Sequence, residues 1–170
     1  KQARIYDYKL IDLKKILNKI KIGNYQILKE MKLETIAKNT KLIGLNEIQI
    51  HLKSPIYAVR FSLNINGKKY DELIGDGVIF ATPFGSTAYY KATGGHNFEK
   101  GIGISFNNLH NQKIDSFVLS EDSTLSLTIT RGPAWLIADN NEDFVELLTG
   151  DKVIIKKSES EANFIYFPTE

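Results

Sequence analysis

Cysteine is absent from this sequence of 170 residues. The chain can therefore form no disulfide, no thiolate metal site and no cysteine nucleophile, and a cytoplasmic setting is the simpler expectation. No apolar run approaches the ~20 residues that a membrane helix needs, and no charged and apolar leader opens the chain. Neither a membrane-spanning nor a secreted protein is expected.

Several catalytic and binding motifs are also missing. There is no Walker A sequence, and Ser86 lacks the flanking glycine of a nucleophile elbow. The histidines, His51, His96 and His110, show no metal-ligand spacing, and His51 on an alternating strand is expected to face solvent. A single tryptophan, Trp135, in an apolar strand provides no aromatic platform for a carbohydrate. P-loop enzymes and serine hydrolases are not expected.

The composition that remains is ordinary for a folded domain, with 42% hydrophobic and 25% charged residues. The length fits one domain with a short extra element. Charge is uneven, because residues 1–41 hold eleven basic and four acidic side chains and the rest of the chain is net acidic. Lysines without interleaved aromatics are more typical of a solvated face than of a nucleic-acid surface. No nucleic-acid partner and no membrane partner are expected.

A single amphipathic helix is predicted near the start of the chain, over residues 13–22. Asp12 is a good N-cap, and Gly23 stands where a C-cap belongs. The apolar residues recur at i, i+3, i+4 and i+7, namely Leu13, Ile16, Leu17 and Ile20.

Beyond Gly23 the apolar period changes from 3.6 to 2, which predicts a mainly β body. Residues 25–33 and 48–52 alternate, and residues 57–65 form the cleanest alternating run. Asn66-Gly67 suits a type I′ hairpin turn, with a return strand through Tyr70. Later strands are expected at 117–119, 125–129, 134–137, 144–147, 153–156 and 164–167. Many short strands indicate a β-sandwich-like fold or a distorted barrel.

The middle of the chain predicts a strand, a tight turn and a short helix. Residues 78–82 are almost continuously apolar, as in a strand buried on both faces. Pro83-Phe84-Gly85 should end this strand, Ser86 should cap a helix over 87–92, and Gly94-Gly95 should terminate it. This order of elements is typical of a ligand site.

Two short motifs could carry function. Asn46-Glu47 places an amide and a carboxylate at the entry to a strand, and Gly75-Asp76-Gly77 places an acid between two flexible residues. Taken singly, the first is interpreted as a turn and the second as a bulge or loop before a strand.

In combination these motifs closely resemble the C-terminal domain of NAD kinases. The resemblance is carried by Leu45-Asn46-Glu47-Ile48, by the unbroken block from Gly75 to Tyr89, and by Gly94-Gly95, in that order and spacing. Gly23-Asn24-Tyr25 resembles the segment before the family's first β-strand, and residues 131–139 resemble its late apolar strand that ends in Asp. The resemblance covers nearly the whole chain.

The resemblance implies a phosphotransferase that makes NADP from NAD by phosphorylating the 2′-hydroxyl of the adenosine ribose. It implies a helical connector over residues 1–23 from an N-terminal α/β domain and a β-rich NAD-binding domain over 24–170. The family's Gly-Gly-Asp-Gly motif, which handles ATP and supplies the catalytic aspartate, does not occur in this sequence. The chain is therefore expected to be a fragment or a degenerate relative, inactive by itself, and its catalytic residue is not among those identified.

The resemblance also assigns roles to individual residues. Asn46 should hydrogen-bond the adenosine moiety, and Glu47 should accept hydrogen bonds from ribose hydroxyls. Asp76 should contact the nicotinamide end, in the family often across a subunit boundary. Thr87 and Ala88 should meet the adenine edge.

Five further positions match the family's NAD pocket. Phe84 departs from the threonine or serine that is usual there, and its ring could stack on the base. The others are Tyr89, which should line the pocket, and Ala92, Ile104 and Asp139.

The implied ligands are NAD, ATP or polyphosphate, and Mg²⁺ or another divalent cation that accompanies ATP. The implied assembly is a homodimer or homotetramer, and no metal-ligating residue is assigned. Two alternatives stay open: a non-catalytic dinucleotide-binding β domain, and a relative of the lipid kinases, which the block from Gly75 to Gly95 disfavours. A β-sandwich carbohydrate binder is the fallback.

Overall fold

A computed structural model describes residues 13–110 and 112–167 of the chain. The described residues divide into a small unit, which includes residues 13–30 and 162–167, and a large unit within Met31–Glu161. No helix in these described ranges is long and apolar enough to cross a membrane.

The small unit contains helix α1 (Leu13–Lys21), which confirms the predicted helix. Asp12, its predicted N-cap, lies outside the described residues. Gly23 has φ +73°, and the N–H groups of Gly23 and Asn24 donate to the carbonyls of Ile20 and Lys19. This is the Schellman pattern that glycine favours at a helix C-terminus.

The described strands form two antiparallel six-stranded sheets, in the orders β2-β1-β12-β9-β4-β5 and β11-β10-β3-β6-β7-β8. This confirms the predicted mainly β, sandwich-like fold. The strands are β1 (Gln26–Ala37), β2 (Thr40–Gly44), β3 (Glu47–Leu52), β4 (Val59–Ile65), β5 (Lys68–Gly75), β6 (Gly77–Ala81), β7 (Ile102–Asn107), β8 (Phe117–Leu119), β9 (Leu125–Arg131), β10 (Ala134–Ala138), β11 (Val145–Leu147) and β12 (Lys152–Tyr166).

The core of the large unit lies between the two sheets. Strand β4 alternates buried and half-buried residues along its whole length, as predicted. Buried side chains of both sheets form one cluster, which includes Phe61 and Leu127 of one sheet and Ile50, Phe80 and Leu136 of the other. The two sheets therefore pack face to face.

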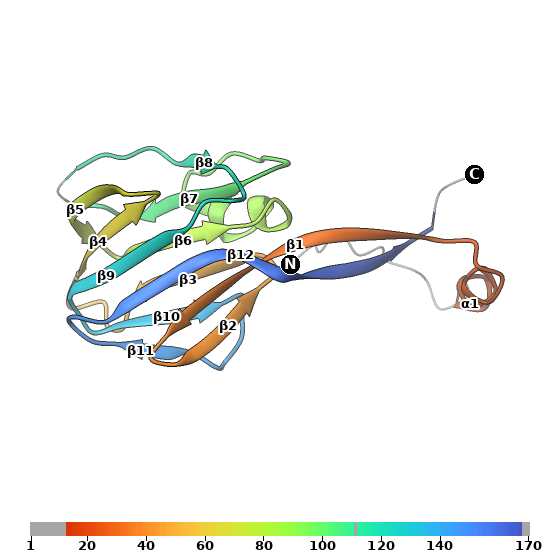
Figure 1. Cartoon of the computed structure of the whole chain (residues 1–170), viewed down its shortest axis with the longest axis horizontal. Coiled ribbons are helices and arrows are strands. Elements are labelled where there is room, and N and C mark those ends of the chain that lie inside the picture. Colours follow the sequence, from red (N-terminus) through yellow and green to blue (C-terminus); the bar gives the residue numbers. More distant parts are fainter. Residues whose placement is uncertain (1–12, 111, 168–170) are drawn as a thin grey trace. The chain divides into compact units, whose positions relative to one another are not determined.

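Strand β6 is buried on both faces, as its continuous apolar sequence predicted. Val78 and Phe80 join the core between the sheets, whereas Ile79 and Ala81 pack on the other side against Tyr90 of helix α2 (Tyr89–Ala92). Figure 1 shows α2 beside β6 and β7. This strand therefore connects the core to the helix that follows it.

Three local predictions were wrong. Ser86 does not cap a helix: it is buried inside a 3₁₀ turn, η2 (Phe84–Thr87), and α2 begins only after Ala88. Residues 153–156 and 164–166 belong to one strand, β12, because the polar segment between them contains no glycine or proline. Tyr57 precedes β4 and is 61% exposed, in a turn in which its N–H donates to the Ser54 carbonyl.

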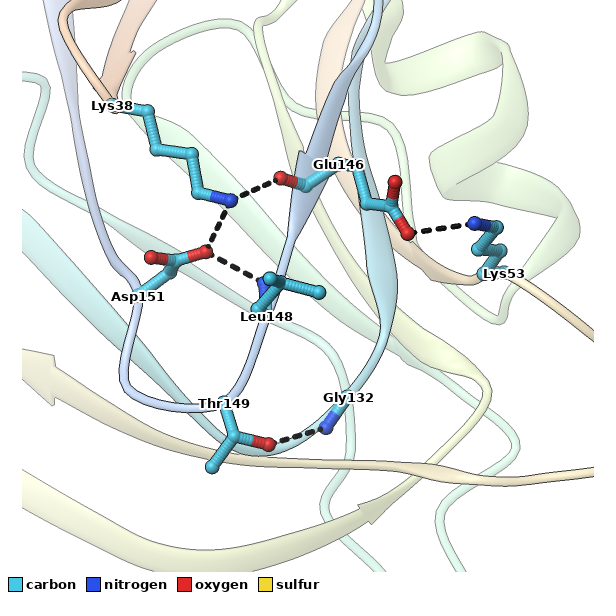
Figure 2. Close-up of polar contacts among 7 residues, drawn as sticks. All are labelled: Lys38, Lys53, Gly132, Glu146, Leu148, Thr149 and Asp151. Carbon is cyan, nitrogen blue, oxygen red and sulfur yellow. Dashed lines mark hydrogen bonds and ion pairs between the residues drawn. The ribbon is translucent and has the colours of Figure 1, made fainter.

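Ionic contacts join the turns around β11, as Figure 2 shows. Lys38 Nζ lies 2.9 Å from the carbonyl oxygen of Glu146 and 2.8 Å from Asp151 Oδ2, which also accepts the Leu148 N–H at 2.6 Å. The Lys38 ammonium and the Leu148 N–H hold the pKa of Asp151 below its usual value. Lys53 binds the Glu146 carboxylate at 2.7 Å.

Candidate functional site

The Asn46-Glu47 motif lies where the chain passes from β2 into β3. Glu47 is the first residue of β3, opposite Ala81 of β6, and only 2% of it is exposed. Asn46 is half-buried. A buried carboxylate at the start of a strand is costly unless its surroundings or a ligand compensate it, so this position is a strong functional candidate.

Asp139 holds this turn from one side. Its Oδ2 accepts the N–H of Leu45 at 2.8 Å, and its Oδ1 accepts the N–H groups of Asn46 and Glu47 at 2.6 and 3.1 Å. The Asp139 N–H donates to the Glu47 carbonyl at 3.0 Å. Both oxygens of this carboxylate are thus engaged by main-chain groups of the turn.

Thr82, directly after β6, holds the same turn from the other side. Its hydroxyl donates to the Leu45 carbonyl at 2.6 Å and accepts the Gly85 N–H at 3.0 Å, and its own N–H donates to the Asn46 carbonyl at 2.9 Å. A Cβ on Gly85 would lie 1.9 Å from the Asn46 carbonyl oxygen, so only glycine fits there. Thr82 therefore fastens the Asn46 turn to η2.

Segment 84–92 presents several of the predicted residues. Thr87 and Ala92 are exposed, and Phe84, Ala88 and Tyr89 are half-buried. Gly94 has φ +92°, and the Gly95 N–H donates to the Tyr90 carbonyl, so this glycine pair ends α2 as predicted.

Tyr89 connects the predicted motifs electrostatically. Burial raises the pKa of its hydroxyl first, and the negative charges of Asp76 and Glu47 raise it further. The phenol therefore keeps its proton at neutral pH and can donate it to an acceptor. The oxygen itself accepts a hydrogen bond from Asn107 Nδ2 at 2.9 Å.

His51 belongs to the same group of side chains. Its Nδ1 lies 2.9 Å from the Leu52 carbonyl, which can only accept, so Nδ1 carries the proton. Its Nε2 then accepts from Asn107 Nδ2 at 3.4 Å. His51 is half-buried, at one of the less buried alternating positions of β3, and it shares its contact to Asn107 with Tyr89.

Asp76 lies in the turn between β5 and β6. Its carboxylate accepts from Asn108 Nδ2 at 3.2 Å and lies 3.8 Å from His110 Nε2. Gly77 has φ +154°, and a Cβ there would lie 2.0 Å from the Ile50 carbonyl oxygen. Close backbone packing therefore explains the glycine that follows Asp76.

Two predicted residues do not present a side chain at this site. Ile104 is fully buried between the sheets, whereas its neighbour Ser105 faces α2 and contacts the Thr93 hydroxyl at 2.6 Å. Asp139 is at the turn, with both carboxylate oxygens bound as described above. Strand alternation could have indicated Ser105, but the roles of Thr82 and Asn107 carry no sequence signal of their own.

No group of three His, Asp or Glu side chains gathers in residues 13–110 and 112–167. Mg²⁺ that accompanies ATP is usually held by the substrate phosphates with one or two carboxylates. The divalent cation therefore stays an expectation, and no step of the function below is assigned to it.

Comparison with known proteins relates this arrangement to one family. The model of the ATP-NAD kinase C-terminal domain matches residues 45–167. A bifunctional NADP phosphatase/NAD kinase of Methanococcus maripaludis is 30% identical over 158 residues, which are 88% of this chain and 28% of that protein. An NAD kinase of Thermoplasma acidophilum is 29% identical over 85% of this chain and 55% of its own length.

Solved structures share the fold. Yeast NADH kinase complexed with NADH superimposes with a TM-score of 0.84 at 22% identity, over 94% of this chain and 50% of that one. An NAD kinase from Archaeoglobus fulgidus in complex with ATP gives a TM-score of 0.74 at 22% identity, over 94% and 60%. The chain spans about half or less of the curated relatives described above.

Proposed function

Because this chain belongs to the NAD kinase family, as its C-terminal domain, we propose that it binds NAD for phosphorylation of the 2′-hydroxyl of the adenosine ribose. The buried Glu47 carboxylate carries this proposal. The main chain around it is held by hydrogen bonds within the protein, and a carboxylate can accept hydrogen bonds from two ribose hydroxyls with its two oxygens.

The proposed pocket extends to both sides of Glu47. The main chain at Ala88 and the Thr87 hydroxyl would meet the adenine edge, with Asn46 on the adenosine moiety. Tyr89 would donate its retained proton to an acceptor of the dinucleotide. Asp76, bound by Asn108, would contact the nicotinamide end of a dinucleotide across the subunit boundary of a homodimer or homotetramer.

The phosphoryl donor would be ATP or polyphosphate. Catalysis of phosphoryl transfer depends mostly on positioning the donor phosphate and the attacking hydroxyl. Glu47 would orient the ribose so that its 2′-oxygen faces the donor. The Gly-Gly-Asp-Gly element that the family resemblance assigns to ATP does not occur in the chain. The alternative proposal is therefore a domain that binds the dinucleotide but does not take part in its phosphorylation.

Titration calorimetry of NAD into the chain tests this function. Glu47→Gln keeps the size of the side chain and removes charge-assisted hydrogen bonds worth roughly 1.5 to 3 kcal/mol, an about ten- to hundredfold loss of affinity. The melting temperature of the ligand-free variant is measured beside the affinity, so that a change in folding is separated from a change in binding.

Glu159→Gln is the matched control, since Glu159 is exposed on β12, and its NAD affinity should equal that of the unmodified chain. Equal affinity of Glu47→Gln would contradict the proposed contact. NAD binding by the chain, with no NADP formed by the full-length gene product, would favour the non-catalytic module.

A further inference from the structure

We infer that Asp139 and Thr82 are positioning residues, which aim the Asn46 and Glu47 side chains without touching the ligand. The inference rests on the proposed function, and it gives Asp139 a role different from the direct NAD contact expected from the family resemblance. The evidence is the hydrogen bonding of residues 45–47.

Every main-chain polar group of these three residues is bonded to Asp139 or Thr82. The three N–H groups donate to the Asp139 carboxylate at 2.6 to 3.1 Å. The carbonyls of Leu45 and Asn46 accept from the Thr82 hydroxyl and N–H, and the Glu47 carbonyl accepts from the Asp139 N–H. Asp139 and Thr82 therefore satisfy all six main-chain polar groups of residues 45–47, so no unpaired N–H or C=O group favours another conformation of the turn.

The position requires a carboxylate in particular. Three consecutive N–H donors converge on one side chain, and only an acceptor-only group with two oxygens can receive them all. An amide at residue 139 would keep one acceptor oxygen and turn an NH₂ group toward N–H donors. Asp139 also has φ +52°, which aspartate tolerates better than most residues.

Thr82 also positions the main chain on the proposed adenine side of the pocket. Its single hydroxyl hydrogen points to the Leu45 carbonyl, while its oxygen accepts the Gly85 N–H at the start of η2. The hydroxyl thus fixes the Asn46 turn relative to the segment that contains Thr87 and Ala88. Thr82 therefore sets the distance between the residues proposed to contact the ribose and those proposed to contact the adenine.

The test measures NAD affinity by calorimetry and amide hydrogen exchange of the ligand-free protein by NMR. For Asp139→Asn we expect at least about tenfold weaker NAD binding, since charge-assisted bonds are lost. The amides of Leu45, Asn46 and Glu47 should exchange at least about tenfold faster, while the core amide of Phe61 keeps its rate. Asp143→Asn, an exposed change four residues away, should alter neither reading.

A second pair of variants covers the case in which Asp139→Asn does not fold. Thr82→Val removes the hydroxyl at constant shape and should weaken NAD binding and release the Gly85 amide to exchange, whereas Thr82→Ser should restore both. Weaker binding with unchanged exchange would mean direct ligand contact and would overturn the inference, as would unchanged affinity. If the unmodified chain does not bind NAD, the proposed function fails, and the exchange rates still decide whether the two residues hold the turn.

Discussion

The hydroxyl of Tyr89 illustrates how neighbouring side chains set the chemistry of one residue. Asn107 donates to its oxygen, and the pKa of Tyr89 is raised first by burial and then by the negative charges of Asp76 and Glu47. The group is therefore a donor toward any ligand, at neutral pH and well above it. In the proposed pocket it would select for an acceptor atom on the dinucleotide.

Replacing Tyr89 with Phe should weaken NAD binding by the roughly 0.5 to 1.5 kcal/mol of one hydrogen bond, an about two- to tenfold effect. Because the pKa of Tyr89 is raised, the ratio of the two affinities should stay constant between about pH 7 and 9, below the ordinary tyrosine pKa of about 10. Calorimetry at several pH values measures the ratio. A ratio that collapses within this range would show that the phenol loses its proton early.

At the scale of elements, the junction between β6 and η2 depends on the absence of a side chain at Gly85. A methyl group there would lie 1.9 Å from the Asn46 carbonyl oxygen, so Gly85→Ala must displace the turn. We expect lower thermal stability and, in protein that stays folded, at least about tenfold weaker NAD binding, since small misplacements of a site are costly.

Gly67→Ala is the comparison for this change. A Cβ at Gly67 meets no atom within 4 Å, but its φ of +91° is strained for alanine. It should cost about 1 kcal/mol of stability and leave NAD affinity unchanged. Similar affinities of the two variants would show that the Gly85 contact does not shape the pocket.

The sheet that contains β1 and β2 includes a buried glutamate, Glu34, that pairs with two lysines that are more exposed and predicts acid sensitivity. Glu34 is 3% exposed, and its carboxylate lies 2.7 Å from Lys41 Nζ and 3.3 Å from Lys156 Nζ. The hydrogen bond with Lys41 is the main reason that the pKa of Glu34 is lowered, against the effect of burial. Its stabilisation is present above the unfolded pKa of about 4.3 and is lost as pH falls through the folded value.

Unfolding by urea at stepped pH measures this contribution. Between about pH 7 and 5 the stability difference between the unmodified chain and Glu34→Gln should be constant, and below about pH 4.3 it should shrink. Glu142→Gln, at an exposed position, controls for general charge effects. A difference that grows as the solution becomes more acidic would contradict the lowered pKa.

How far the fold and site follow from sequence depends on how local each determinant is. Asn66-Gly67 and Gly23 were predicted correctly because a turn or helix end depends on a few adjacent residues. The cap at Ser86 was predicted wrongly, since that residue is buried within the 3₁₀ turn η2 instead. The hydrogen bonds between Asp139 and the Asn46 turn join residues that are 92 to 94 positions apart in the sequence, and no local sequence pattern predicts them.

At the scale of the whole molecule, the activity of these 170 residues by themselves is a separate question from NAD binding. The chain contains no Gly-Gly-Asp-Gly sequence, and positioning of both substrates dominates phosphoryl transfer. We expect no NADP when the chain is incubated with NAD, ATP and Mg²⁺. A coupled assay with an NADP-dependent dehydrogenase detects the product, and its appearance would show that the chain holds a complete active site.

The long span between the Asn46 turn and Asp139 also has a consequence during synthesis of the protein on the ribosome. The turn is translated more than 90 residues before the carboxylate that receives its N–H groups, and closing so large a loop is a late, entropically costly event. Until residue 139 has left the exit tunnel, the nascent chain has β2 and β3 but no shaped binding turn. Retention of stalled nascent chains on an immobilised dinucleotide would therefore begin only after β10 has emerged, which makes ligand capture a marker of late folding.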